Sequence, residues 1–120
     1  PSMVIPGKDS PRQATARQVA DMTVQLLKAV VPADVPGIAF LSGGQSDQLA
    51  TEHLSLMNQT GRLPWWLTFS FGRALQAPAQ KAWAGQAANV AAGQAAYLKR
   101  ARLNGAARSG AYDPAQEAAA

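Results

Sequence analysis

Two short apolar runs in this sequence each end in a glycine-containing turn, and helix-forming sequence follows each turn directly. The first run, Ile38 to Leu41, leads into Ser42-Gly43-Gly44, and the second, Trp65 to Phe71, leads into Gly72-Arg73. The first run is continuously apolar, which is typical of a strand covered on both faces in a parallel sheet. A repeated order of strand, tight turn and helix predicts parallel strands joined by crossover helices.

Helix and strand boundaries extend this order along the whole chain. Pro1 to Gly7 is a short apolar run closed by a Pro-Gly turn, which is typical of the end of a strand. Thr15 and Gln18 form the capping-box pattern of a helix start, and Pro32 ends that helix. The predicted elements are strands at about residues 1–5, 37–41 and 65–71, helices at about 16–31, 46–58, 78–84 and 86–108, and a flexible tail at 109–120.

The length sets how much of such a fold the sequence holds. Residues 1–120 contain three strand–helix units, whereas a closed barrel of eight units takes roughly 250 residues. The chain therefore holds one incomplete α/β domain over residues 1–120, with about three-eighths of the content of a (β/α)8 TIM barrel. A three-stranded piece of a doubly wound sheet is the alternative architecture.

Composition excludes several classes of chemistry. The sequence has no cysteine and one histidine, so it offers no disulfide, no thiolate nucleophile and no His or Cys cluster for a metal. We expect neither a metal nor another cofactor. His53 lies among apolar positions of its predicted helix, and we interpret it as a packed side chain. No apolar run approaches the roughly 20 residues of a membrane span, so we expect a soluble, cytoplasmic protein without membrane contact.

The two glycine turns hold the residue types that bind an anion. Glycine lets backbone amides approach an oxyanion closely, and a following helix adds free N–H groups and the positive end of its dipole. Ser42 and Ser70 offer hydroxyl donors, Arg73 offers a planar cationic fork, and the net charge of +4 favours anionic partners. In (β/α)8 barrels a phosphate site commonly uses the loops after strands seven and eight, which matches these turns if the three units are the last three. The alternative is that Gly43-Gly44 only closes a turn and that Arg73 is a solvated cation.

A run of cations near the end of the sequence leaves other functions open. Lys99-Arg100-Ala101-Arg102, with Arg108 downstream, is typical of a small basic nucleic-acid-binding module. The exposed edges of a three-stranded sheet would suit a non-catalytic interaction protein. A solvated helix face also explains these cations, because only Tyr97 offers an aromatic platform beside them. Nucleic acid is therefore not the partner that we expect.

Several stretches resemble the C-terminal third of class I fructose-1,6-bisphosphate aldolases. They are Pro36 to Ser46 (PGIAFLSGGQS), Leu67 to Gln76 (LTFSFGRALQ) and Lys81-Ala82-Trp83, and Pro1 to Gly7 is similar to the family's Lys-Pro-Asn-Met-Val segment and its Pro-Gly turn. The match keeps motif order and spacing over nearly the whole chain. It implies the last three βα units of a (β/α)8 lyase of glycolysis and gluconeogenesis. That lyase reversibly cleaves fructose 1,6-bisphosphate to dihydroxyacetone phosphate and glyceraldehyde 3-phosphate through a lysine Schiff base, without a metal.

The resemblance also assigns residues and partners. The family's Schiff-base lysine immediately precedes the proline that corresponds to Pro1, so we assign no catalytic residue and expect the 120 residues alone to be inactive. Lys8, the nearest lysine, lies in the loop beyond the strand and is not expected to replace it. The implied partners are a sugar bisphosphate substrate, the rest of the aldolase barrel and, in the assembled enzyme, further copies in a homotetramer. The residues implied to bind a substrate phosphate are Ser42, Gly43, Gly44, Ser70, Gly72 and Arg73.

Overall fold

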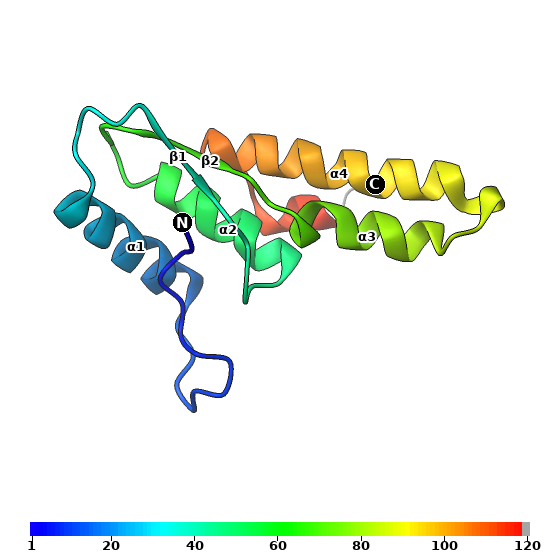
Figure 1. The fold of residues 1–120 in the computed structure, drawn as a ribbon, viewed down its shortest axis with the longest axis horizontal. Coiled ribbons are helices and arrows are strands. Elements are labelled where there is room, and N and C mark those ends of the chain that lie inside the picture. The colour runs from blue at the N-terminus through cyan, green and yellow to red at the C-terminus, as the bar shows by residue number, and fades with distance from the viewer. Residues whose placement is uncertain (119–120) are drawn as a thin grey trace.

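A computed structural model describes residues 1–118 as helices packed against a short parallel sheet (Figure 1). Two of the three predicted strands form, and a helix connects them as a crossover. The elements are α1 (Ala16–Val30), β1 (Gly37–Phe40), α2 (Asp47–Asn58), β2 (Trp66–Phe69), α3 (Arg73–Trp83), the 3-10 turn η1 (Ala87–Asn89), α4 (Val90–Arg108) and the 3-10 turn η2 (Pro114–Glu117).

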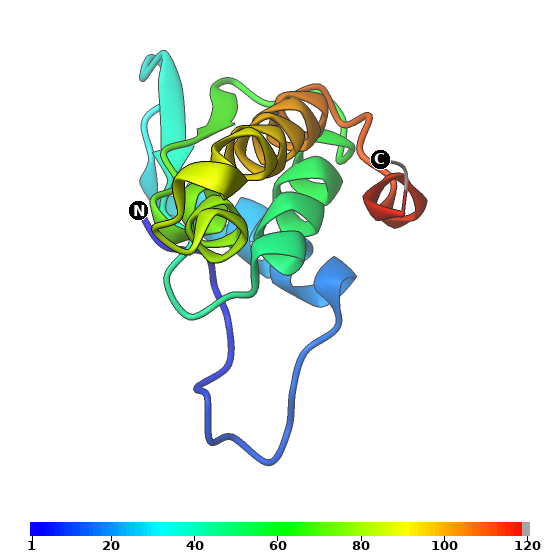
Figure 2. The ribbon, with the colours of Figure 1, turned by 90° about the vertical axis from the view of Figure 1, so that its right-hand side faces the viewer.

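The two strands pair in parallel, as the continuous apolar run predicts. Ile38 lies opposite Leu67, and Phe40 lies opposite Phe69. Ile38, Phe40 and Leu67 are buried on the face of the sheet that packs against the helices. Gly37 and Ala39, which alternate with the buried residues of β1, are exposed, so among the described residues this strand is covered on one face and not on both as predicted. Figure 2 shows α2 and α4 side by side, with the strands on one side of the pair and η2 on the other. The sheet therefore holds the ends of β1 and β2 next to each other.

The core lies between the helices and the covered face of the sheet. The capping box predicted for α1 is present, because Gln18 N donates to Thr15 Oγ1 (3.1 Å) and Thr15 N donates to Gln18 Oε1 (2.9 Å). In the part of the chain that the structure describes, no helix has the length and apolar character needed to cross a membrane. The buried apolar side chains of this core include Val24, Leu27, Phe40, Leu54, Met57, Trp65, Leu67, Phe71 and Leu103.

The strand predicted at residues 1–5 does not form among the described residues. Met3 is buried and Leu41 N donates to Pro1 O at 3.0 Å, so the segment does pass beside the end of β1. However, the amide of Val4 donates to the side-chain oxygen of Thr23 on α1, at 2.9 Å, instead of to a neighbouring strand. The Thr23 side chain therefore accepts the hydrogen bond that the Val4 amide would donate to a neighbouring strand in a sheet.

The third predicted helix starts earlier than its sequence indicates. Helix α3 begins at Arg73, directly after Gly72, and continues through Pro78, where the prediction placed its start. Proline removes one backbone donor inside the helix, and the alanine-rich flanking residues nevertheless keep the helical conformation. The last long helix begins at Val90, after the η1 turn, because Ala84 and Gly85 adopt positive φ angles of 52° and 71° and reverse the chain.

The predicted flexible tail is ordered over residues 109–118, whereas residues 119–120 lie outside the described part of the chain. Tyr112 is buried, and its amide donates to Ser55 Oγ at 3.2 Å. Asp113 caps η2 by accepting a hydrogen bond from Ala115 N at 2.7 Å. The segment therefore packs on α2 through Tyr112 and Ser55, a contact that the alanine-rich composition of this segment does not predict.

Candidate anion-binding site

The first predicted turn follows β1 and leads into α2. Gln45 N donates to Ser42 O (3.1 Å), which closes the turn, and Ser46 Oγ accepts from Leu49 N (3.2 Å), which caps the helix. Gly44 has a φ of 76°, and a Cβ atom at this position would lie 2.9 Å from Ile5 Cδ1. The left-handed backbone conformation therefore favours glycine here, whereas the contact with Ile5 Cδ1 involves only the end of a flexible side chain.

The second turn follows β2 and leads into α3. Ser70 N donates to Phe40 O at 2.8 Å, which ties this turn to the end of β1. Gly72 stands at the N-cap of α3, and Leu75 N and Gln76 N both donate to its carbonyl oxygen. Arg73 is the first residue of the helix and is exposed. The parallel sheet thus places two helix starts at the same edge.

One cavity of about 520 Å³ lies between these turns. Three of the six predicted site residues, Ser42, Gly44 and Arg73, line it. Within residues 1–118, the other three, Gly43, Ser70 and Gly72, belong to the same two turns but do not line the cavity. The remaining lining residues are Lys8, Gln45, Asp47, Ala74 and Ala77.

The charges around the cavity are mixed. Arg73 and Lys8 contribute positive charge, and Asp47, in the first turn of α2, contributes negative charge. An acidic residue at this position stabilises the helix by interacting with its dipole, although it repels a bound anion. Lys8 was not predicted as a site residue, and no local motif marks it, because it reaches the cavity from the loop between Gly7 and Thr15.

Gln45 connects the cavity to the buried histidine of α2. His53 Nδ1 lies 2.7 Å from Gln45 Oε1. Burial lowers the pKa of His53 from its ordinary value of 6.5 to about 4, so the ring is neutral near pH 7 and its Nδ1–H tautomer donates to the glutamine oxygen. This placement agrees with the interpretation of His53 as a packed side chain, and it shows that Gln45, which received no role from its sequence context, orients toward the core.

The cations of the predicted basic run make contacts inside the protein. Lys99 Nζ donates to Glu117 O, and Arg100 is buried and forms an ion pair with Glu117 at 2.6 Å. The Arg108 guanidinium lies 5.5 Å from the centre of the Trp66 ring, which is a cation–π distance. Among the described residues, Arg102 is the one exposed cation of this run without such a contact. The run is therefore not a continuous basic surface, and it gives no support to the nucleic-acid-binding alternative.

Parallel strand–turn–helix units with serine, glycine and arginine at the ends of the strands define an α/β protein with a candidate phosphate site. Comparison with known families narrows this class. A family model described as fructose-bisphosphate aldolase class-I matches residues 1–120. The chain belongs to the class-I fructose-bisphosphate aldolase family, which confirms the resemblance found in its motifs.

Individual relatives agree with this assignment. The chain is 51% identical over 119 residues to fructose-bisphosphate aldolase B of Sparus aurata, which covers 98% of this chain and 33% of that protein. It is 53% identical over 113 residues to the cytosolic fructose-bisphosphate aldolase 5 of Arabidopsis thaliana, covering 93% of this chain and 31% of that protein. The chain therefore spans about a third of the length of these curated relatives.

A solved structure confirms the fold class. Fructose-bisphosphate aldolase from Plasmodium falciparum, crystallised in complex with TRAP and a small molecule inhibitor, superposes with a TM-score of 0.91. The two are 42% identical, and the match covers 94% of this chain and 33% of that chain. The described strands and helices are thus part of a (β/α)8 barrel, with parallel strands and crossover helices as predicted.

Proposed function

We propose that this chain contributes a substrate-phosphate site to a class I aldolase. That enzyme would reversibly cleave fructose 1,6-bisphosphate to dihydroxyacetone phosphate and glyceraldehyde 3-phosphate through a lysine Schiff base. The observation that carries the proposal is the cavity between two consecutive strand ends, which is lined by Ser42, Gly44 and Arg73. Family membership supports the choice of a sugar bisphosphate as the anion.

Each lining residue would make a different contact with the phosphate. The guanidinium of Arg73 presents two parallel N–H donors to a pair of phosphate oxygens. The hydroxyl of Ser42 and the amides near Gly44 would donate to the remaining oxygens, with the α2 dipole favouring the negative charge. Gly43, Ser70 and Gly72 would act through the backbone shape of the two turns. Asp47 opposes the binding and would limit its strength.

We assign no catalytic residue within the 120 residues. A Schiff-base lysine needs a desolvated pocket that lowers the pKa of its amine. Lys8 is the one lysine that lines the cavity within the described part of the chain, and its side chain is exposed. We propose that the lysine nucleophile of the complete barrel immediately precedes the position of Pro1 and that the acid–base groups come from other strands. We expect the isolated 120 residues not to cleave the substrate.

Substitution of Arg73 tests the proposed phosphate site. We expect the wild-type chain to bind inorganic phosphate and fructose 1,6-bisphosphate in calorimetric titrations, and Arg73→Ala to weaken both by about tenfold or more, because a charge-assisted contact contributes roughly 1.5–3 kcal/mol. Arg102→Ala is the matched control, since it removes the same charge from an exposed position on α4 that does not line the cavity. Equal affinities of Arg73→Ala and Arg102→Ala would contradict the proposal.

We further propose that the assembled enzyme is a cytoplasmic homotetramer. The resemblance supports the tetramer, and relatives named as cytosolic in Arabidopsis thaliana and cytoplasmic in Cicer arietinum support the location. A relative from Oryza sativa is named as chloroplastic, so family membership alone is compatible with either compartment. Light scattering of the complete protein tests the tetramer, and a mass of one or two subunits would contradict it.

A further inference from the structure

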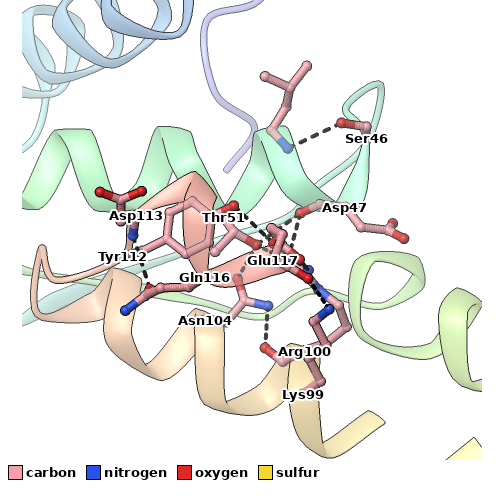
Figure 3. Close-up of polar contacts among 11 residues, drawn as sticks. Ser46, Asp47, Thr51, Lys99, Arg100, Asn104, Tyr112, Asp113, Gln116 and Glu117 are labelled. Atoms are coloured by element: carbon pink, nitrogen blue, oxygen red, sulfur yellow. Dashed lines mark hydrogen bonds and ion pairs between the residues drawn. The ribbon is translucent and has the colours of Figure 1, made fainter. Parts of the chain in front are cut away.

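A buried arginine on α4 joins three segments of the chain. Arg100 is only 4% exposed, and its Nη1 donates to both carboxylate oxygens of Glu117, at 2.6 and 2.7 Å (Figure 3). Its Nη2 donates to Thr51 Oγ1 at 2.5 Å and to Asp47 O at 3.3 Å. One guanidinium therefore links the C-terminal turn η2 to the first turn of α2.

Other contacts hold Glu117 in place against this arginine. The hydroxyl of Tyr112 donates to Glu117 Oε1 at 2.9 Å, and Lys99 Nζ donates to the Glu117 carbonyl oxygen. Burial, and then the hydrogen bond to Glu117, raise the pKa of Tyr112, so its hydroxyl keeps the proton that it donates. Because the Arg100–Glu117 pair is largely withdrawn from water, loss of one partner would leave the other as an uncompensated buried charge.

The first turn of α2 is also one wall of the candidate anion site. Asp47, the first residue of α2, lines the cavity. Ser46, the residue before it, caps the N-terminus of this helix. The Asp47 carbonyl oxygen accepts from Arg100, and the Thr51 hydroxyl oxygen lies 2.9 Å from that carbonyl oxygen and 2.9 Å from Asn104 Oδ1. Arg100 thus holds the start of α2 through its hydrogen bonds to Asp47 O and Thr51 Oγ1.

We propose that Arg100 and Glu117 are positioning residues for this anion site. Docking of the segment Tyr112–Glu117 holds the Arg100 guanidinium in its fork geometry. The guanidinium in turn holds Asp47, the residue of α2 that lines the cavity, at the start of the helix. The inference rests on the proposed phosphate function of the cavity. Because coupling between two sites is reciprocal, a bound phosphate must stabilise the docked C-terminal segment by the same factor by which docking raises phosphate affinity.

Glu117→Gln separates positioning from long-range electrostatics. The substitution makes the chain more positive, so electrostatics alone predicts tighter binding of inorganic phosphate. Positioning predicts weaker binding, by about fivefold or more, which is the lower end of typical coupling between sites. Asp21→Asn is the matched control, because it makes the same charge change at an exposed position of α1 whose nearest cation, Arg17, is 3.9 Å away. We expect its phosphate affinity to equal or slightly exceed that of the wild-type chain.

A second readout distinguishes positioning from a purely structural role. We expect saturating phosphate to slow hydrogen exchange at the amides of residues 112–117 in the wild-type chain, and to have no such effect in Glu117→Gln. Tyr112→Phe keeps the ion pair and removes one hydrogen bond, so it provides a folded variant with a smaller loss of affinity if Glu117→Gln does not fold.

The outcomes separate this inference from the proposed function. If the wild-type chain binds phosphate and neither Glu117→Gln nor Tyr112→Phe weakens the binding, the positioning role is overturned and the phosphate site stands. If the wild-type chain does not bind phosphate at all, the proposed site is overturned together with the inference. The positioning role is supported if these variants bind phosphate more weakly and if phosphate slows hydrogen exchange of residues 112–117 in the wild-type chain.

Discussion

The buried position of His53 makes the stability of the chain depend on pH. Its pKa is about 4 in the folded chain and 6.5 as an ordinary value, so below pH 6.5 the unfolded chain takes up a proton that the folded chain does not. We expect this contribution to stability to be complete above pH 6.5, to fall as the pH is lowered from 6.5 to about 4, and to level off below that.

Thermal unfolding at several pH values measures this dependence. His53→Asn lacks the titrating ring, and the sequence has no other histidine, so the variant isolates the contribution of this residue. We expect the melting temperature of the wild-type chain to fall more steeply than that of His53→Asn between pH 6.5 and 4. Parallel curves for the two proteins would show that the ring is not buried as a neutral group.

The positions of residues that line the candidate cavity were predictable where a short motif defines them. Ser42, Gly44 and Arg73 lie in the turns that come just after the two strands. Because a parallel sheet brings the carboxyl ends of its strands to one edge, sequence order was enough to place these residues at one cavity. Lys8 and Gln45 were not predictable. Lys8 approaches along a loop whose path depends on tertiary contacts, and the orientation of Gln45 depends on a hydrogen bond to a helix residue eight positions away.

Helices α3 and α4 form an antiparallel hairpin that extends beyond the sheet (Figure 1), and a glycine sets how closely they pack. A Cβ atom on Gly93 of α4 would lie 3.0 Å from Trp83 Cβ and 3.2 Å from Ala79 O, both on α3. Gly105, on the same helix, has open space around its Cα. The two glycines therefore differ in packing although both stand in helical sequence.

Alanine substitutions at these two glycines test the close packing. Gly105→Ala should stabilise the chain by about 0.5–1 kcal/mol, since alanine favours the helix over glycine. Gly93→Ala gains the same propensity but pushes α3 away from α4, so we expect its free energy of unfolding to be at least about 1 kcal/mol below that of Gly105→Ala. Chemical denaturation measures both, and equal stabilities would mean that the helices are not in contact at Gly93.

Element boundaries were predictable where a side chain caps the backbone and not where context overrides a residue's usual preference. The Thr15 capping box and the serine at the start of α2 placed two helix starts to within one residue. Pro78 and the alanine-rich end of the chain were interpreted by their usual preferences, and both interpretations were wrong. The helix continues through Pro78, and the residues after Arg108 pack because Tyr112 and Glu117 bind to α2 and α4.

At the scale of the whole molecule, the family and the fold class followed from motifs, whereas the long-range polar contacts did not. The Arg100–Glu117 pair joins residues 17 positions apart, and neither hydrophobic periodicity nor turn chemistry indicates which cation in a basic run will be buried. The same run suggested a nucleic-acid surface for this reason. Burial of Arg100 and the contact of Arg108 with Trp66 are properties of the packed chain and not of the local sequence.

The most direct test of the account is a map of backbone amide shifts during titration of the wild-type chain with inorganic phosphate. We predict that the largest changes fall on the two turns, residues 42–49 and 70–75, with smaller changes in residues 112–117 through Arg100. Changes confined to residues 99–108, or spread evenly over exposed cations, would contradict a phosphate site at the ends of β1 and β2.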